Sequence, residues 1–146
     1  MSKKSKIIVG AMALGVVLAL VLSKGLATKD IDMLNSTAEV EITAENLLSV
    51  LGEGNQKAID SLKSERVFEV AGWVKETNLM NGRITVLLKG NEDLPPYIIC
   101  DMMPHQKKAV SQLKPNDSVK IKGIFKGFLK DAVFLDCIIT FSQTND

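Results

Sequence analysis

The N-terminal segment constrains this chain of 146 residues more than any other part of its sequence. Three lysines lie within residues 3–6, an unbroken apolar run follows over residues 7–22, and Lys24 closes it. A soluble domain has no need of such a run at its N-terminus, so the pattern predicts a membrane anchor or an export signal. The rest of the chain is then expected to work on the far side of a membrane.

The length of the apolar run leaves two alternatives open. A helix over residues 7–22 would span about 24 Å, which is shorter than the hydrocarbon core of about 30 Å, although Lys6 and Lys24 can snorkel to the two interfaces. Gly25 and Ala27 make a poor cleavage site because Lys24 adjoins them. We favour an anchor with its N-terminus in the cytoplasm and the domain outside, since lysines precede the run. Cleavage would instead release a secreted or periplasmic protein.

The charged residues divide unequally between this segment and the rest of the chain. Four of the 18 basic residues flank the apolar run, whereas all 17 acidic residues lie beyond Ala27. The remainder therefore carries 14 basic and 17 acidic residues, a net charge of −3. Neutralisation of phosphates supplies most of the affinity of nucleic-acid binders, so this sign disfavours a nucleic-acid partner without excluding one.

Beyond the apolar segment, an amphipathic helix is predicted to open a single compact domain. Thr43 is a good N-cap residue, and Glu45 in the first turn suits the helix dipole. Apolar residues from Leu47 to Leu62 recur near a helical period, but two glycines within residues 52–54 predict a kink or a break. We divide the chain into residues 1–27 (anchor or signal peptide), 28–42 (linker), 43–142 (folded domain with its N-terminal helix) and 143–146 (tail).

From Val67 onwards the hydrophobic period changes from that of a helix to that of strands. Alternation with a period of two predicts five strands, around residues 67–74, 84–88, 97–102, 119–126 and 133–141. Asn81-Gly82 is a strong signal for a hairpin between the first two. Pro104 suits the first turn of a helix between the third and fourth strands. Five short strands with a helix at that place are the layout of an OB fold. We therefore predict an all-β, five-stranded OB-fold barrel with flanking helices.

Several short stretches of the domain share their order and spacing with a known family. They are residues 43–47, 55, 58, 67–72, 85–88, 99–100, 113–114, 117–119, 121–123, 127–131 and 136–137. Over residues 43–141 the chain resembles the tRNA-anti-like family, bacterial OB-fold proteins that usually follow a signal peptide or an N-terminal anchor. Asn116 stands where the family's turn usually has glycine, and Phe125 where many members have a further cysteine. The family name records a likeness to anticodon-binding domains, and fold alone does not imply an RNA function.

Both cysteines of the chain, Cys100 and Cys137, fall at inward-facing positions of the predicted third and fifth strands. These strands are neighbours in an OB barrel. A disulfide between them would close a loop of about 37 residues and stabilise the fold by about 3–4 kcal/mol. The alternative is two buried thiols that pack as small apolar groups. With His105 as the single histidine, the chain shows too few ligands for a structural metal site, so none is expected.

Four side chains are candidates for contact with a ligand. Trp73 falls on the outward-facing side of the first strand, and Tyr97 is predicted to share its face, near the strands across which OB folds commonly bind ligands. The alternative for Trp73 is packing against the amphipathic helix. Lys120 and Lys122 belong to a basic stripe along the fourth strand. This stripe either steers an anionic ligand or forms a solvated strand face.

The sequence shows no recognisable catalytic constellation. A nucleophile with its base, a phosphate-binding loop and a pair of carboxylates are all missing from it, so we expect neither an enzyme nor a cofactor. We predict a non-catalytic OB-fold binding or interaction module, tethered in the cell envelope, whose ligand is a protein, a glycan or a small molecule. The alternative is a single-stranded nucleic-acid binder, which the fold favours and the charge disfavours.

Overall fold

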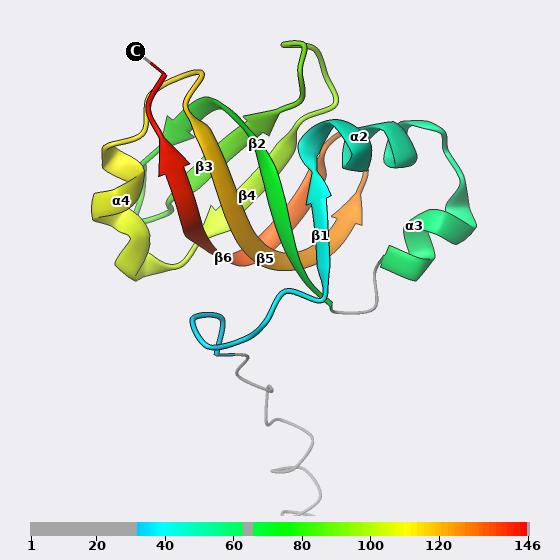
Figure 1. The fold of residues 1–146 in the computed structure, drawn as a ribbon, viewed down its shortest axis with the longest axis horizontal. Coiled ribbons are helices and arrows are strands. Elements are labelled where there is room, and N and C mark those ends of the chain that lie inside the picture. Colours follow the sequence, from blue (N-terminus) through cyan, green and yellow to red (C-terminus); the bar gives the residue numbers. More distant parts are fainter. Residues whose placement is uncertain (1–31, 63–65, 146) are drawn as a thin grey trace, which may run out of the picture. The chain divides into compact units, whose positions relative to one another are not determined.

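The computed structural model describes residues 32–62 and 66–145 (Figure 1). The apolar run at residues 7–22 lies outside these residues, so the anchor or signal peptide stays a prediction. Within the part of the chain that is described, no helix is both long and apolar enough to cross a bilayer.

Five strands close into a barrel (Figure 1). They are β2 (Val67–Asn78), β3 (Thr85–Lys89), β4 (Ile98–Met102), β5 (Ser118–Phe128) and β6 (Ala132–Gln143). Around the barrel their order is β2-β3-β4-β6-β5, and pairing of β5 with β2 closes it. The β4–β6 pair is parallel and the other four pairs are antiparallel. This is the OB-fold arrangement, so the predicted five-stranded barrel is confirmed.

A further short strand, β1 (Val40–Thr43), runs parallel to β2 and places Val40 opposite Phe68. Residues 28–42 were predicted to be a linker, but those from 32 onwards are part of the folded domain. Met33 is only 1% exposed and is buried against it. Half-buried and exposed residues alternate in β1 over four positions, which is too short a pattern to be recognised in the sequence.

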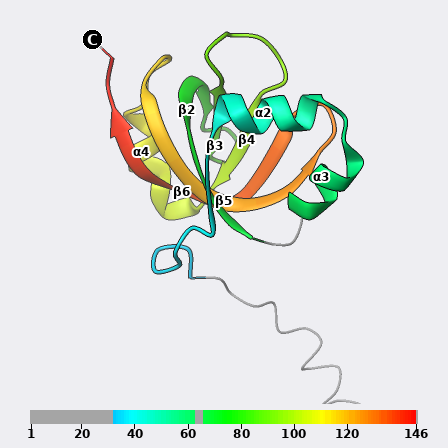
Figure 2. The same ribbon diagram turned by 45° about the vertical axis from the view of Figure 1, so that its right-hand side comes forward.

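Two helical segments cover the openings of the barrel. Helix α2 (Ala44–Gly52) begins after Thr43, whose hydroxyl oxygen accepts a hydrogen bond from the backbone N–H of Asn46 at 3.2 Å. The other segment is η1 (Pro104–Gln106) with α4 (Lys107–Ser111). Leu47 of α2 and Val110 of α4 are fully buried in the core. Figures 1 and 2 show α2 and α4 on opposite sides of the barrel. The remaining helix is α3 (Gln56–Leu62).

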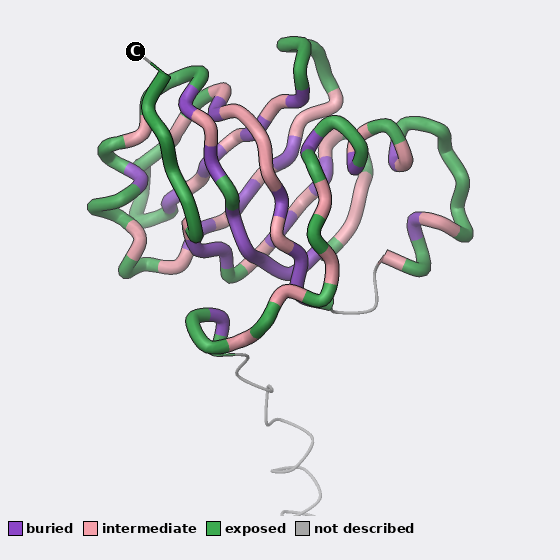
Figure 3. The backbone as a smooth tube through the Cα atoms, viewed as in Figure 1, coloured by how far each residue is buried: buried purple, intermediate pink, exposed green. Residues whose placement is uncertain are grey.

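The barrel interior is filled by side chains rather than left open. Phe68, Phe125 and Phe134 pack against one another with ring centroids 5.4–6.2 Å apart. Figure 3 shows the buried residues along the barrel strands and the exposed residues mainly on loops, helices and the last part of β6. Since the interior is closed, any ligand must bind on the outside of the barrel or at its rims.

Cys100 and Cys137 both lie in the core, at 1% and 0% exposure, which agrees with their predicted inward orientation. They belong to the neighbouring strands β4 and β6 and are free thiols in this structure. Burial, together with a hydrogen bond to Cys100, raises the pKa of the Cys137 thiol. The two thiols thus lie on neighbouring strands, while the disulfide itself stays a prediction.

Candidate ligand-binding groove

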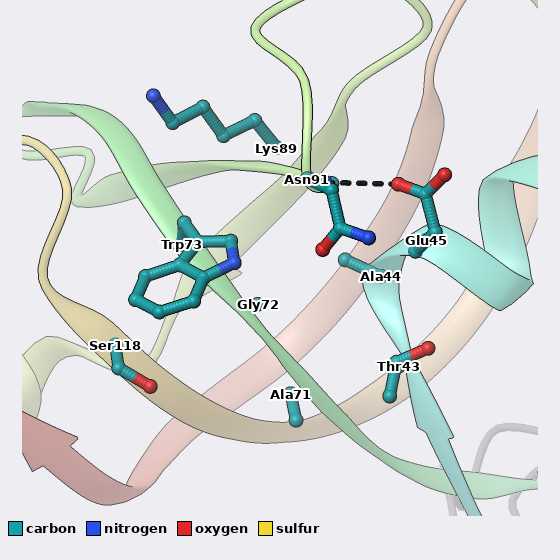
Figure 4. Close-up of a pocket in the computed structure, with 10 residues that line it drawn as sticks. Thr43, Ala44, Glu45, Ala71, Gly72, Trp73, Lys89, Asn91 and Ser118 are labelled. Atoms are coloured by element: carbon teal, nitrogen blue, oxygen red, sulfur yellow. Dashed lines mark hydrogen bonds between the residues drawn. The ribbon is translucent and has the colours of Figure 1, made fainter.

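The outer side of β2 forms the floor of a groove with two adjoining pockets. The first, which we call the Trp73 pocket, has a volume of about 240 Å³. The adjoining pocket has a volume of about 290 Å³ and shares Thr43 and Ala71 with the first. We call the two together the Trp73 groove. The side chains that matter in the Trp73 pocket are Thr43, Glu45, Ala71, Trp73, Lys89, Asn91 and Ser118 (Figure 4).

Two glycines bring helix α2 close enough to form one wall of the groove. A Cβ atom on Gly72 would lie 2.8 Å from the Cβ of Ala44, a distance that real side chains do not tolerate. A Cβ atom on Gly90 would collide with the carboxylate of Glu45. That carboxylate accepts a hydrogen bond from the backbone N–H of Asn91 at 2.8 Å (Figure 4). The start of α2 is thus fixed against β2 and the end of β3.

Trp73 is half-buried and stands across the pocket from α2. Strand pairing places it between Lys89 of β3 and Ser118 of β5. Figure 4 shows the indole ring on the opposite side of the pocket from Ala44 and Glu45. The helix therefore does not cover the ring, and the indole remains available to a ligand in the pocket.

The ammonium group of Lys89 does not serve the pocket. It donates a hydrogen bond to the side-chain oxygen of Asn116 at 2.6 Å and lies 3.8 Å from a carboxylate oxygen of Asp93. Asn116 has a φ of 72°, which explains why glycine usually occupies this turn in similar sequences. The side chain that replaces glycine here provides the acceptor for Lys89. What faces the pocket is a set of neutral polar groups together with the carboxylate of Glu45.

Tyr97 lines neither pocket of the Trp73 groove. The Tyr97 hydroxyl donates to Asp93 at 3.0 Å, and the Lys75 ammonium lies 4.8 Å from the centre of its ring. Lys75 also bonds Asp93 at 2.8 Å. This hydrogen bond is the main reason why the pKa of Lys75 is raised and that of Asp93 is lowered. Lys75, Asp93 and Tyr97 thus contact one another, and Lys89 lies beside them.

The two lysines predicted to form a basic stripe, Lys120 and Lys122, differ in their exposure and in their contacts. Lys120 is exposed, lines the adjoining pocket and lies 4.0 Å from the Glu69 carboxylate. Lys122 is only 8% exposed and donates to the backbone carbonyl of Ser36 at 2.7 Å. The chain before β1 folds over this part of β5, so Lys122 holds that chain in place and cannot reach an external ligand.

The sequence analysis did not find three of the pocket residues. Asn91 and Ser118 lie in a loop and at a strand end, and nothing in the sequence distinguishes them from other polar residues there. Glu45 was interpreted only as a favourable residue in the first turn of a helix. Its contact with Asn91, 46 residues away along the chain, exists only in the folded protein.

A model of the tRNA-anti-like family matches residues 1–139. The chain belongs to this family. The resemblance seen in the sequence is thereby confirmed, and with it the OB fold of the domain. No curated protein matches the chain.

Several solved structures are similar to this tRNA-anti-like protein at low sequence identity. A lipoprotein from Klebsiella pneumoniae, for which nucleic-acid binding has been proposed, has 11% identity over 68% of this chain and 91% of its own, with a TM-score of 0.55. The Stn1–Ten1 complex of S. pombe has 11% identity over 53% of this chain and 56% of that one, with a TM-score of 0.39. Asparaginyl-tRNA synthetase from Pyrococcus horikoshii has 12% identity over 61% of this chain and 22% of its own, with a TM-score of 0.43. The chain thus spans about half of the Stn1–Ten1 chain, and these likenesses concern the fold alone.

The outer side of β3, β4 and β6 is a second surface of the tRNA-anti-like barrel, which we call the β3–β4 face. OB folds commonly bind ligands there. Its centre is a row of half-buried apolar side chains in register across the three strands, namely Leu87, Ile99 and Val133. Ion pairs border the row, Arg83 with Asp101 at 3.1 Å and Lys75 with Asp93 at 2.8 Å.

Proposed function

We propose that the chain is a non-catalytic binding module, held in the cell envelope by residues 7–22 with its domain outside the cytoplasm. The observation that carries the proposal is the Trp73 groove, a concave surface with an uncovered indole ring and several unengaged polar groups. Ligand sites typically combine a concave apolar surface with a few placed hydrogen-bonding groups. The closed barrel core keeps these groups in fixed positions.

The partners of the charged groups in the groove favour binding over catalysis. Glu45 accepts from the backbone of Asn91, and Lys89 is held by Asn116. Glu69 of the adjoining pocket accepts a hydrogen bond from the Thr140 hydroxyl at 2.9 Å. An acid–base catalyst needs groups that are free to exchange protons with a substrate. Groups engaged in this way are better suited to shaping a site than to reacting in it.

The alternative function is binding of single-stranded nucleic acid, which the structural likeness to the Klebsiella lipoprotein favours. A strand of nucleic acid requires a track of free cations and aromatic rings on which bases stack. On the β3–β4 face, Arg83 and Lys75 are engaged by acidic side chains, and the Tyr97 ring is occupied by Lys75. Together with the acidic balance of the domain, this makes nucleic acid the second candidate.

Topology and binding measurements test the proposal. Alkaline phosphatase fused after residue 146 is expected to be active, because the enzyme requires an oxidising compartment. Activity of a cytoplasmic reporter at the same position would contradict the envelope assignment. The full chain in detergent is expected to show no saturable binding of fluorescent DNA and RNA 20-mers at about 20 mM salt. Tight binding that weakens steeply towards about 200 mM salt would establish the alternative.

A further inference from the structure

We propose that the Trp73 pocket holds one uncharged sugar ring of a glycan chain. The inference rests on the proposed binding function and names the ligand class for the same groove. A pyranose ring has a face of C–H groups and a rim of hydroxyl groups. Its site therefore needs an aromatic surface for the face and a mixture of hydrogen-bond donors and acceptors for the rim.

The indole of Trp73 provides the aromatic surface. It stands half-exposed at one side of the pocket, and the floor beside it is formed by the small residues Ala71 and Gly72. The pocket volume of about 240 Å³ lies below the range of about 300–1,000 Å³ typical of drug-sized ligands, which suits a single ring. A sugar ring in the space between Trp73 and the start of α2 would contact the indole (Figure 4).

Polar groups from four separate segments surround this position. The Thr43 hydroxyl accepts from the Asn46 backbone and is still able to donate. The Ser118 hydroxyl and the Asn91 side-chain amide each offer a donor and an acceptor, and the indole of Trp73 offers a further N–H. Sugar hydroxyls, which donate and accept, complement such a set better than groups that can only donate or only accept.

Anionic ligands fit this pocket less well. An anion would need a free cation, but the Lys89 ammonium points away from the pocket to Asn116 (Figure 4). In the adjoining pocket, Lys120 lies beside the Glu69 carboxylate. An uncharged ligand needs no free cation, so the engagement of Lys89 and Lys120 does not oppose its binding.

An extended peptide lacks its usual means of attachment on the floor of the groove. Peptides that bind to sheets add a strand to an open edge. On the floor of the groove, residues 68–71 of β2 pair with β1 on one side and with β5 on the other. No edge of β2 is open there, although the outer edge of β1 has no strand partner among the described residues. A ligand that lies on the floor itself therefore depends on side-chain groups. These are the groups that a glycan uses.

The adjoining pocket extends the site along β2. It opens from the Trp73 pocket at Thr43 and Ala71 and adds the side chains of Asn46, Glu69 and Lys120. With a volume of about 290 Å³ it is large enough for the next ring of the same chain. The groove therefore suits two consecutive sugar units.

The single tryptophan of the chain gives a direct measurement, because Trp73 is the only source of indole fluorescence. The full chain in detergent is titrated with uncharged tetrasaccharides of glucose and of N-acetylglucosamine. We expect at least one of them to shift the Trp73 emission in a saturable way, equally at about 20 and about 300 mM salt, since no charge is neutralised. N91A and S118A are each expected to raise the Kd by about three- to tenfold. N78A, which changes an exposed asparagine of β2 outside both pockets, is the matched control and should not change it.

The other outcomes separate this inference from the proposed function. No response to either tetrasaccharide overturns the glycan assignment. A response to a thymidine 12-mer or to a basic octapeptide instead overturns it as well, but leaves a binding module. A saccharide response that both N91A and S118A retain in full overturns the assignment to the Trp73 pocket. A cytoplasmic reporter result contradicts the envelope proposal whatever the titration shows.

Discussion

The Trp73 groove and the β3–β4 face are two outer surfaces of one barrel that differ in how their polar groups are engaged. In the groove, the Ser118 hydroxyl, the Asn91 amide and the indole of Trp73 face a pocket. On the β3–β4 face, Arg83 and Lys75 are paired with Asp101 and Asp93, and the centre is apolar. The polar groups of the Trp73 groove can form hydrogen bonds with a ligand, whereas those of the β3–β4 face already bind other groups of the protein.

The difference arises from elements that are added to the barrel rather than from the barrel itself. Strand β1 and helix α2 stand beside β2 and convert its outer side into a groove. The five barrel strands provide a rigid floor, since their inward side chains form one packed core. An OB barrel can thus gain a groove at a position that depends on its N-terminal extension.

The largest expected effect tests whether α2 is an integral wall of the groove. Leu47 of α2 is fully buried, so L47A should lower the free energy of unfolding by about 2–5 kcal/mol in urea denaturation. L87A is the matched control on the β3–β4 face, where the side chain is half-buried, and should cost about 1 kcal/mol. An equal or greater loss for L87A would mean that α2 contributes little to the fold.

A smaller effect is expected where α2 approaches β2. In G72A the new methyl group would meet Ala44 and the Lys89 carbonyl oxygen, so the helix must shift at a cost of about 1–3 kcal/mol. The shift should also change the emission of Trp73. G127A places a methyl group where no atom lies within 4 Å and serves as the control. Unchanged stability and emission in G72A would show that the wall of the groove is not fixed by this contact.

Lys122 tests how firmly the chain before β1 is attached. K122M removes the donor to the Ser36 carbonyl and should cost about 1 kcal/mol, again measured by urea unfolding. K126M changes an exposed lysine on the same strand and should alter the stability by less than about 0.5 kcal/mol. Equal losses of stability in K122M and K126M would mean that the hydrogen bond of Lys122 to Ser36 does not stabilise the fold.

The smallest effect concerns the contacts among Lys75, Asp93 and Tyr97 beside the β3–β4 face. Because Lys75 and then Tyr97 lower the pKa of Asp93, the carboxylate stabilises the fold above its unfolded pKa of about 3.9 and this contribution is lost as the pH falls through the lower folded value. Lys75, whose pKa is raised, loses its contribution at the alkaline end. D93N should therefore be slightly less stable than the original chain near neutral pH and equal to it in strong acid. A difference that persists in acid would point to lost packing instead.

The sequence determined the elements whose causes are local. The N-cap at Thr43 forms as predicted, and Asn81 and Gly82 adopt the positive φ values of 56° and 73° that a hairpin turn of this kind requires. Alternation with a period of two correctly assigned Cys100 and Cys137 to the interior. Each of these depends on residues that are close together in the chain.

Only the tertiary structure decided which outward-facing residues meet. Alternation tells which residues point out of a sheet, but a closed barrel turns its outer side through a full circle, so outward residues on different strands point in different directions. Trp73 and Tyr97 are both outward and yet do not share a site, and an irregularity between Val74 and Glu76 further changes the register of β2 against β3. The pocket joins Trp73 to Glu45, and that juxtaposition depends on the packing of α2 against the barrel, which no local pattern encodes.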